Sequence, residues 1–163
     1  MRRVALPSEV EGSLWLDAMP GRGEPLARAW RAVADERIDV IVALAGLDET
    51  RRVSPEYASA IAAGAVPCVR LELPAPDYGV PDDRWGFCDL VSDVAARLRG
   101  GQRVLVHCNM GIGRTGTLAV CLLVALGAAL EDAQRAVEAA GSSPMTPEQD
   151  DLVAWYASRS THA

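Results

Sequence analysis

The 163-residue sequence lacks any long apolar run. Its longest apolar stretch, 118–126, is far shorter than the roughly 20 residues that a membrane-spanning helix needs, and it is typical of a buried helix. The N-terminal segment 1–17 reaches acidic and polar residues before any apolar run long enough for a signal peptide. We therefore expect a soluble, cytoplasmic protein with no membrane partner.

An excess of positive charge is also lacking. The sequence has 16 basic and 22 acidic residues, which gives a formal net charge of −6. This balance argues against a broad nucleic-acid footprint and a polybasic membrane patch, but it permits a local cationic pocket. There is no lysine, and all 16 basic residues are arginine. That bias is typical of a GC-rich bacterial genome, and we assign it no mechanistic role.

Cysteines are few and do not form a metal-binding or disulfide pattern. The four are Cys68, Cys88, Cys108 and Cys121, with no CxxC pair and no adjacent histidine other than His107. Because neither a zinc site nor a disulfide framework fits this spacing, we expect a reducing compartment. Three of the cysteines lie in strand-like or helix-like stretches typical of small buried side chains. Only Cys108 lies in a motif.

Strand-like and helix-like segments alternate along the chain. Apolar alternation or short apolar runs predict strands over 13–19, 38–44, 66–73 and 104–106. Apolar residues at helical spacing predict helices over 24–36, 54–64, 84–98, 115–126, 131–140 and 147–156. This alternation indicates the α/β class, with a central, mostly parallel sheet of about four to five strands flanked by helices. We expect a single domain over 1–163.

The segment VLVHCNMGIGRTGT, residues 104–117, carries the chemistry. It places a strand before Cys108, and Arg114 at the start of a long apolar helix. Gly111 and Gly113 lie between them and permit a tight loop whose backbone N–H groups converge on one anion. The positive N-terminal end of the helix points to the same place. The spacing predicts a phosphate-binding loop with a thiolate at its floor, because such surroundings lower a cysteine pKa from about 8.5.

The residues of this predicted loop are Asn109, Met110, Gly111, Ile112, Gly113 and Arg114. Arg114 would hold two phosphoryl oxygens bidentately, a geometry that lysine does not match.

The segment HCNMGIGRTGT is similar to the HCxxGxxR[ST]G signature of the protein tyrosine phosphatase superfamily, and nearly the whole chain resembles its compact dual-specificity and kinase-associated group. The resemblance implies that Cys108 attacks phosphorus and forms a phosphocysteine intermediate. LPAPDYGVPDD resembles the general-acid loop, which puts the acid on Asp77, whereas Asp82 and Asp83 fit N-cap and first-turn positions of the next helix. SSPMTPEQDDLV resembles the loop whose glutamine orients the hydrolytic water, and Gln149 matches it.

Five further residues have less specific roles. Thr115 can donate a hydrogen bond to the thiolate or act as an ordinary helix N-terminal hydroxyl. His107 can orient the loop or be a satisfied core histidine. Arg22 and Glu49 each follow a strand-like segment and could line the mouth of the cleft, but we predict that both are solvated at the surface. Tyr78 lies on the general-acid loop, where it can touch a substrate ring.

The resemblance implies a phosphotyrosine or dual-specificity protein phosphatase that needs no metal ion and no cofactor. Its partner would be a phosphorylated protein or a small phosphomonoester, with no nucleic acid, and we expect a monomer. Two alternatives stay open. The same fold could act on a phosphoinositide, a nucleotide or an RNA 5′-phosphate, although Asn109, Met110 and Ile112 add no charge to the loop. A non-catalytic phosphate-binding module is the other, although such modules usually lack the cysteine, the arginine or the acid.

Overall fold

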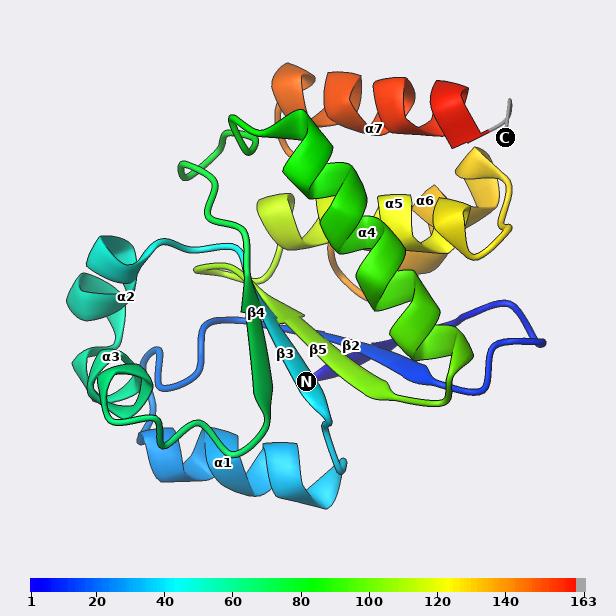
Figure 1. Ribbon diagram of the computed structural model, residues 1–163. Helices are drawn as coiled ribbons and strands as arrows, with labels where there is room; N and C mark the ends of the chain where they lie inside the picture. Colours follow the sequence, from blue (N-terminus) through cyan, green and yellow to red (C-terminus); the bar gives the residue numbers. More distant parts are fainter. Residues whose placement is uncertain (161–163) are drawn as a thin grey trace.

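The computed structural model describes residues 1–160, which form a five-stranded sheet and seven helices (Figure 1). The strands are β1 (Arg2–Val4), β2 (Ser13–Asp17), β3 (Val40–Ala43), β4 (Val69–Glu72) and β5 (Arg103–His107). The helices are α1 (Leu26–Asp35), α2 (Leu47–Val53), α3 (Pro55–Ala62), α4 (Arg84–Arg99), α5 (Gly113–Ala125), α6 (Leu130–Ala139) and α7 (Pro147–Ser160). Residues 161–163 of the expected domain lie outside the described residues.

The sheet has the strand order β1-β2-β5-β3-β4, and every neighbouring pair is parallel except β1 with β2. The prediction of an α/β fold with a mostly parallel sheet is confirmed. Strand β5 lies in the middle, paired with β2 and β3. Because the carboxyl ends of parallel strands share one edge, the segments that follow β3, β4 and β5 meet there.

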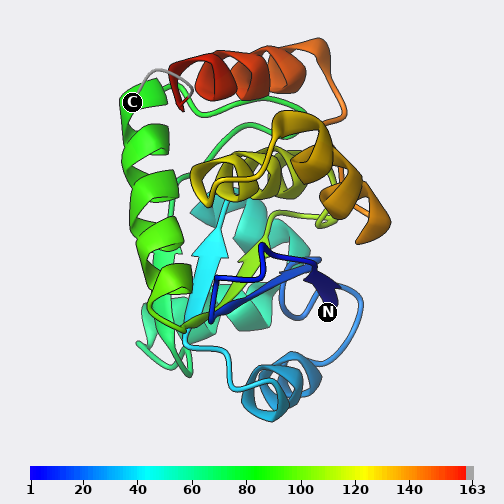
Figure 2. The ribbon, with the colours of Figure 1, turned by 90° about the vertical axis from the view of Figure 1, so that its right-hand side faces the viewer.

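Helices cover both faces of the sheet, with α4 to α7 on one side and α1 on the other (Figures 1 and 2). Side chains of β5 alternate between these faces, as the period of a strand requires. Val104 and Val106 pack in the larger core with α4 to α7. Leu105 packs in a smaller core with Ile41 and with Val33 of α1. Strand β5 is thus buried on both sides and gives the segment after it a rigid support.

The sequence patterns missed two elements, β1 and α2. Strand β1 has only three residues, too few for a recognisable alternation. Helix α2 has no apolar stripe, since Thr50 is its only buried residue. It has acidic residues in its first turn and basic residues in its last turn, the distribution that the helix dipole favours. No helix within residues 1–160 is both long enough and apolar enough to cross a membrane.

Candidate active site

The turn between β5 and α5 forms a tight loop around the Cys108 sulfur. Gly111 has a φ of 72°, and a Cβ there would lie 2.1 Å from the carbonyl oxygen of Asp17, so only glycine fits. The Gly111 N–H donates to Cys108 Sγ at 3.3 Å. The Gly111 carbonyl oxygen accepts from Arg2 Nη2 at 2.5 Å and from Ser142 Oγ at 2.7 Å. Neighbouring elements therefore fix this part of the loop with an amide directed at the sulfur.

Cys108 is buried, and its environment favours the thiolate. Burial raises the pKa of the thiol, but the Thr115 hydroxyl and amide, the Arg114 charge and the Gly111 N–H outweigh it and hold the pKa of Cys108 below its ordinary value. The Thr115 hydroxyl is buried near the sulfur, and no neutral acceptor within residues 1–160 lies in hydrogen-bond geometry with it. An ionised sulfur is the acceptor that it would gain.

The other three cysteines have the opposite electrostatics. Burial raises the pKa of Cys68 to about 11, and it also raises the pKa of Cys88 and Cys121 above the ordinary value. Cys121 is fully buried in the core, as predicted for a small apolar side chain, whereas Cys68 and Cys88 are partly buried. Cys108 is therefore the cysteine best suited to act as a nucleophile.

Glu49 holds Arg114, so the prediction of a solvated Glu49 was wrong. Arg114 Nη1 and Nη2 donate to the two carboxylate oxygens of Glu49 at 2.8 Å each. Nη1 also donates to the Ala75 carbonyl oxygen at 2.9 Å, and Nη2 to Asp77 Oδ1 at 3.0 Å. The hydrogen bonds from Arg114 hold the pKa of Glu49 below its ordinary value, against the effect of burial. The side chain of Glu49 is only 13% exposed, because α2 carries it over the phosphate-binding loop.

We expect Glu49→Gln to lower kcat by roughly 10- to 100-fold. A neutral amide cannot accept both Arg114 hydrogen bonds, and a lost charged hydrogen bond corresponds to about 1.5–3 kcal/mol. The measurement is kcat for an aryl phosphate, with thermal unfolding recorded to confirm folding. Asp48→Asn, which changes an exposed carboxylate on the same helix, is the matched control and should leave kcat unchanged. Equal kcat values for Glu49→Gln and wild type would show that Glu49 is not needed to position Arg114.

Arg22 is exposed as predicted, but it also contacts the loop. Its Nε donates to Asn109 Oδ1 at 2.8 Å.

The loop after β4 places Asp77 beside Arg114 and uses Asp83 elsewhere. The side chain of Asp77 is 55% exposed, and its Oδ1 accepts the hydrogen bond from Arg114 described above. Asp83 caps α4, because Oδ1 accepts from the N–H groups of Trp85 at 3.1 Å and Gly86 at 2.9 Å. Of the two residues predicted for the N-cap and the first turn of this helix, Asp83 is the N-cap, whereas Asp82 lies before the helix and not in its first turn.

Gln149 joins the Asp77 loop to the segment before α7. The amide is buried, and its Oε1 accepts from the Met145 N–H at 2.8 Å. Its Nε2 donates to the Gly79 carbonyl oxygen at 3.0 Å. Thr146 Oγ1 adds a bond of 3.1 Å to the Tyr78 carbonyl oxygen. Gln149 therefore reaches the site predicted for it, while its role with water stays a prediction.

These segments enclose a pocket of about 140 Å³ that Cys108 helps to line. Its lining residues come from the three loops and are Asp77, Tyr78, Cys108, Met110, Ile112, Gly113, Arg114, Met145 and Gln149. Tyr78, Met110 and Met145 are each more than half exposed, at 62%, 51% and 53%, and form an apolar rim. The predicted nucleophile, arginine, acid and glutamine are thus brought together.

His107 lies behind the loop and supports the backbone of Cys108. Its Nδ1 is 3.0 Å from the Cys108 carbonyl oxygen, which can only accept, so Nδ1 carries the proton. Burial lowers the pKa of His107 to about 4, so the ring is neutral at pH 7 and Nε2 accepts from the Tyr57 hydroxyl at 3.1 Å. Tyr57 Oη in turn accepts from Arg70 Nε at 3.4 Å. His107 is therefore a satisfied core histidine that also orients the loop.

His107 should make the free energy of unfolding depend on pH. Its pKa is about 4 when folded and about 6.5 when unfolded, so between these values the unfolded state binds the additional proton. The stabilisation by the neutral ring is full above pH 6.5 and is lost as the pH falls, by up to about 3 kcal/mol at pH 4. Urea unfolding of wild type and His107→Gln at pH 7 and pH 4 measures it. Identical pH slopes for the two proteins would contradict this assignment.

Comparisons with known proteins point to phosphatases. Residues 17–128 match a family model described as "Polymorphic toxin system, DSP-PTPase phosphatase". The chain is 48% identical over 54 residues to tyrosine-protein phosphatase non-receptor type 4 of Homo sapiens, an alignment that covers 29% of this chain and 6% of the relative. It is 36% identical over 62 residues to cyclin-dependent kinase inhibitor 3 of Rattus norvegicus, covering 37% of this chain and 28% of the relative. The chain therefore matches only a small part of these curated relatives.

The fold is shared with solved phosphatase structures. The crystal structure of kinase associated phosphatase with its catalytic-site cysteine substituted by serine superposes with a TM-score of 0.81. The superposition covers 99% of this chain and 96% of the other, at 19% sequence identity. At that identity the similarity establishes the architecture.

Proposed function

The chain belongs to the DSP-PTPase phosphatase family of polymorphic toxin systems, within the cysteine-dependent protein tyrosine phosphatases, and from this premise we propose that it hydrolyses phosphomonoesters with Cys108 as the nucleophile. One observation carries the proposal: a cysteine with a lowered pKa shares a pocket with Arg114 and the carboxylate of Asp77. A thiolate, an anion-binding loop and a proton donor are the three groups that this chemistry requires.

In the first step, the Cys108 thiolate attacks phosphorus and forms an S–P bond while the P–O bond to the leaving group breaks. Asp77 gives its proton to the leaving oxygen. The backbone N–H groups of the loop and the Arg114 guanidinium stabilise the charge on the non-bridging oxygens. The product of this step is a phosphocysteine.

In the second step, a water molecule attacks phosphorus, the S–P bond breaks, and inorganic phosphate forms. The Asp77 carboxylate takes the proton of the water, and Thr115 donates a hydrogen bond to the departing thiolate. Gln149 orients the water with the amide hydrogen of Nε2 that Gly79 does not use.

The substrate class in this proposal is a phosphotyrosine or dual-specificity phosphoprotein. The apolar rim of Tyr78, Met110 and Met145 can contact the side chain that carries the phosphate. The loop itself adds no charge for a phosphoinositide or a nucleotide, so those substrates are less favoured. We further propose that the protein works as a monomer in a bacterial cytoplasm. A catalytic thiolate needs reducing surroundings, which favours the cytoplasm. The all-arginine composition is typical of a GC-rich bacterial genome.

A substrate panel with EDTA present tests the proposal. It contains phosphotyrosine and phosphoserine peptides, a phosphoinositide, a nucleotide and a small aryl phosphate. We expect release of inorganic phosphate from the aryl phosphate and from a phosphopeptide. No turnover of any monoester would favour a phosphate-binding module instead. Faster turnover of the phosphoinositide or the nucleotide than of the phosphopeptides would show that the substrate is not a phosphoprotein.

A further inference from the structure

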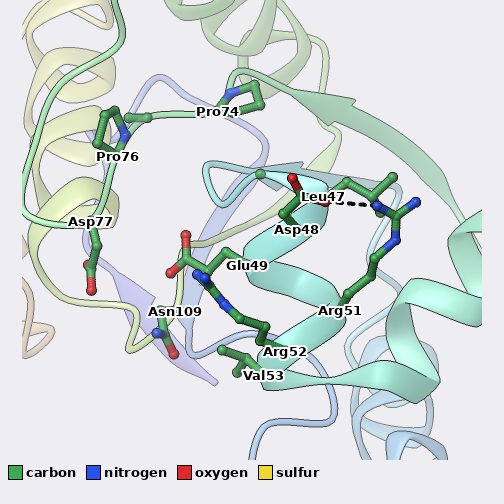
Figure 3. Close-up of a pocket in the computed structure, with 12 residues that line it drawn as sticks. Leu47, Asp48, Glu49, Arg51, Arg52, Val53, Pro74, Pro76, Asp77 and Asn109 are labelled. Carbon is green, nitrogen blue, oxygen red and sulfur yellow. Dashed lines mark hydrogen bonds and ion pairs between the residues drawn. The ribbon is translucent and has the colours of Figure 1, made fainter.

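A second and larger cavity, of about 750 Å³, lies beside the catalytic pocket (Figure 3). It runs between α2 and the segment 74–77, and we call it the α2 groove. Asp77 lines both cavities, and Asn109 of the phosphate-binding loop also lines the groove. The two cavities are therefore adjacent, and a substrate larger than its phosphate can reach from the catalytic pocket into the α2 groove.

The walls of the groove are largely apolar. They include side chains of α2 and of the proline-rich segment after β4, namely Leu47, Val53, Pro74, Ala75 and Pro76. Leu47 is 41% exposed, so its apolar surface is open to a ligand. Such walls suit the side chains and the backbone of an extended polypeptide better than a sugar or a headgroup covered with hydroxyls.

The acidic side chains that line the groove are already paired. Glu49 and Asp77 both bond Arg114, and Asp48 forms an ion pair with Arg51 at 2.8 Å. Arg51 turns away from the catalytic end of α2 to meet Asp48 (Figure 3). The negative charges of the groove are thus matched within the protein.

Arg52 is the cation left over in the groove. It is exposed and forms no hydrogen bond or ion pair with another residue in the part of the chain that the structure describes. Figure 3 shows its guanidinium alongside Glu49, on the side of α2 where Asn109 lies. Asn109, which lines the groove, also accepts a hydrogen bond from Nε of the exposed Arg22, which itself lies outside the groove. Arg52 therefore supplies an unpaired positive charge in the groove that shares Asp77 with the catalytic pocket.

We propose that the α2 groove is a subsite for an acidic side chain of a polypeptide substrate, near its phosphorylated residue, and that Arg52 recognises that carboxylate. The inference rests on the proposed phosphatase activity and makes its substrate class narrower. Arginine suits this role because its planar guanidinium can bind a carboxylate through two parallel hydrogen bonds.

The subsite is tested with pairs of phosphotyrosine peptides. The two members of a pair differ at one position, which holds Asp in one peptide and Asn in the other. One pair is made for each position within three residues of the phosphotyrosine. For at least one position, wild type should show a kcat/KM about fivefold higher for the Asp peptide, the range of a partly exposed ion pair. Arg52→Gln should lower that ratio to about one. Arg51→Gln, the matched control on the same helix, should keep it. Neither residue lines the catalytic pocket, but the charge of Arg52 also acts on Glu49. The Asp/Asn ratio is therefore compared within each variant, and a small aryl phosphate measures each variant's basal rate separately.

Three results would overturn the subsite: no preference for Asp in wild type, a preference that survives Arg52→Gln, or an equal loss in Arg51→Gln. The last result would assign the preference to the overall charge of α2. Failure of the phosphatase proposal is a separate outcome, because wild type would then release no phosphate from the aryl ester either.

Discussion

Replacing Cys108 with serine is expected to lower kcat by roughly 10⁴-fold or more, while inorganic phosphate still binds. A serine hydroxyl is not ionised near neutral pH, and the surroundings that lower the pKa of Cys108 are insufficient to ionise an alcohol. The loop would keep its shape, because the Gly111 carbonyl oxygen is held by Arg2 and Ser142 rather than by the sulfur. Replacing the sulfur atom by oxygen should therefore abolish nucleophilic attack and leave anion binding intact.

Steady-state kinetics with an aryl phosphate and calorimetric titration with inorganic phosphate measure the two effects. Cys88→Ser is the matched control, since this cysteine lies on α4, outside the pocket, and should leave kcat unchanged. Residual activity of Cys108→Ser within tenfold of wild type would rule out covalent catalysis through this sulfur.

The parts of the site that follow from sequence are local ones. Cys108, the glycine turn and Arg114 lie within one strand, turn and helix, so their spacing alone brings them together. The cap by Asp83 is local too, because the N–H groups that it accepts are two and three residues further on. Such contacts need no knowledge of the tertiary structure.

Glu49 is different, because 65 residues separate it from Arg114. Only the packing of α2 over the loop joins them, and α2 has no apolar stripe from which it could be predicted. One signal was present: Glu49 follows β3, which is the neighbour of β5, and parallel strands end at the same edge. That rule indicates nearness to the site but does not distinguish a solvated carboxylate from one that holds an arginine.

Arg2 shows a second limit. It is 109 residues from Gly111, and it reaches the loop because β1 pairs with β2 at the sheet edge. Three residues are too few to show the apolar alternation of a strand, so neither β1 nor this contact could be predicted from the sequence.

The general acid gives the second large effect. Asp77→Asn should lower kcat for a tyrosyl or alkyl phosphate by roughly 10²- to 10³-fold, because a basic leaving group needs a proton as the P–O bond breaks. An ester of an acidic phenol leaves without that proton and should lose no more than about tenfold. Asparagine keeps an oxygen that can accept from Arg114, so the change removes the proton donor with little disturbance of the arginine. The basic limb of the pH profile should flatten as well.

A series of aryl phosphates with leaving groups of increasing basicity measures this effect as the slope of log kcat against leaving-group pKa, which should steepen in Asp77→Asn. Asp82→Asn is the matched control, because Asp82 is exposed in the same loop and does not line the pocket. Asp83→Asn should also keep the wild-type slope, since asparagine caps a helix about as well as aspartate. A steeper slope in either control, with the wild-type slope in Asp77→Asn, would move the acid to that residue. The attack by Cys108 would be unaffected, because Arg114 and the loop amides stabilise the phosphoryl oxygens whichever carboxyl group supplies the proton.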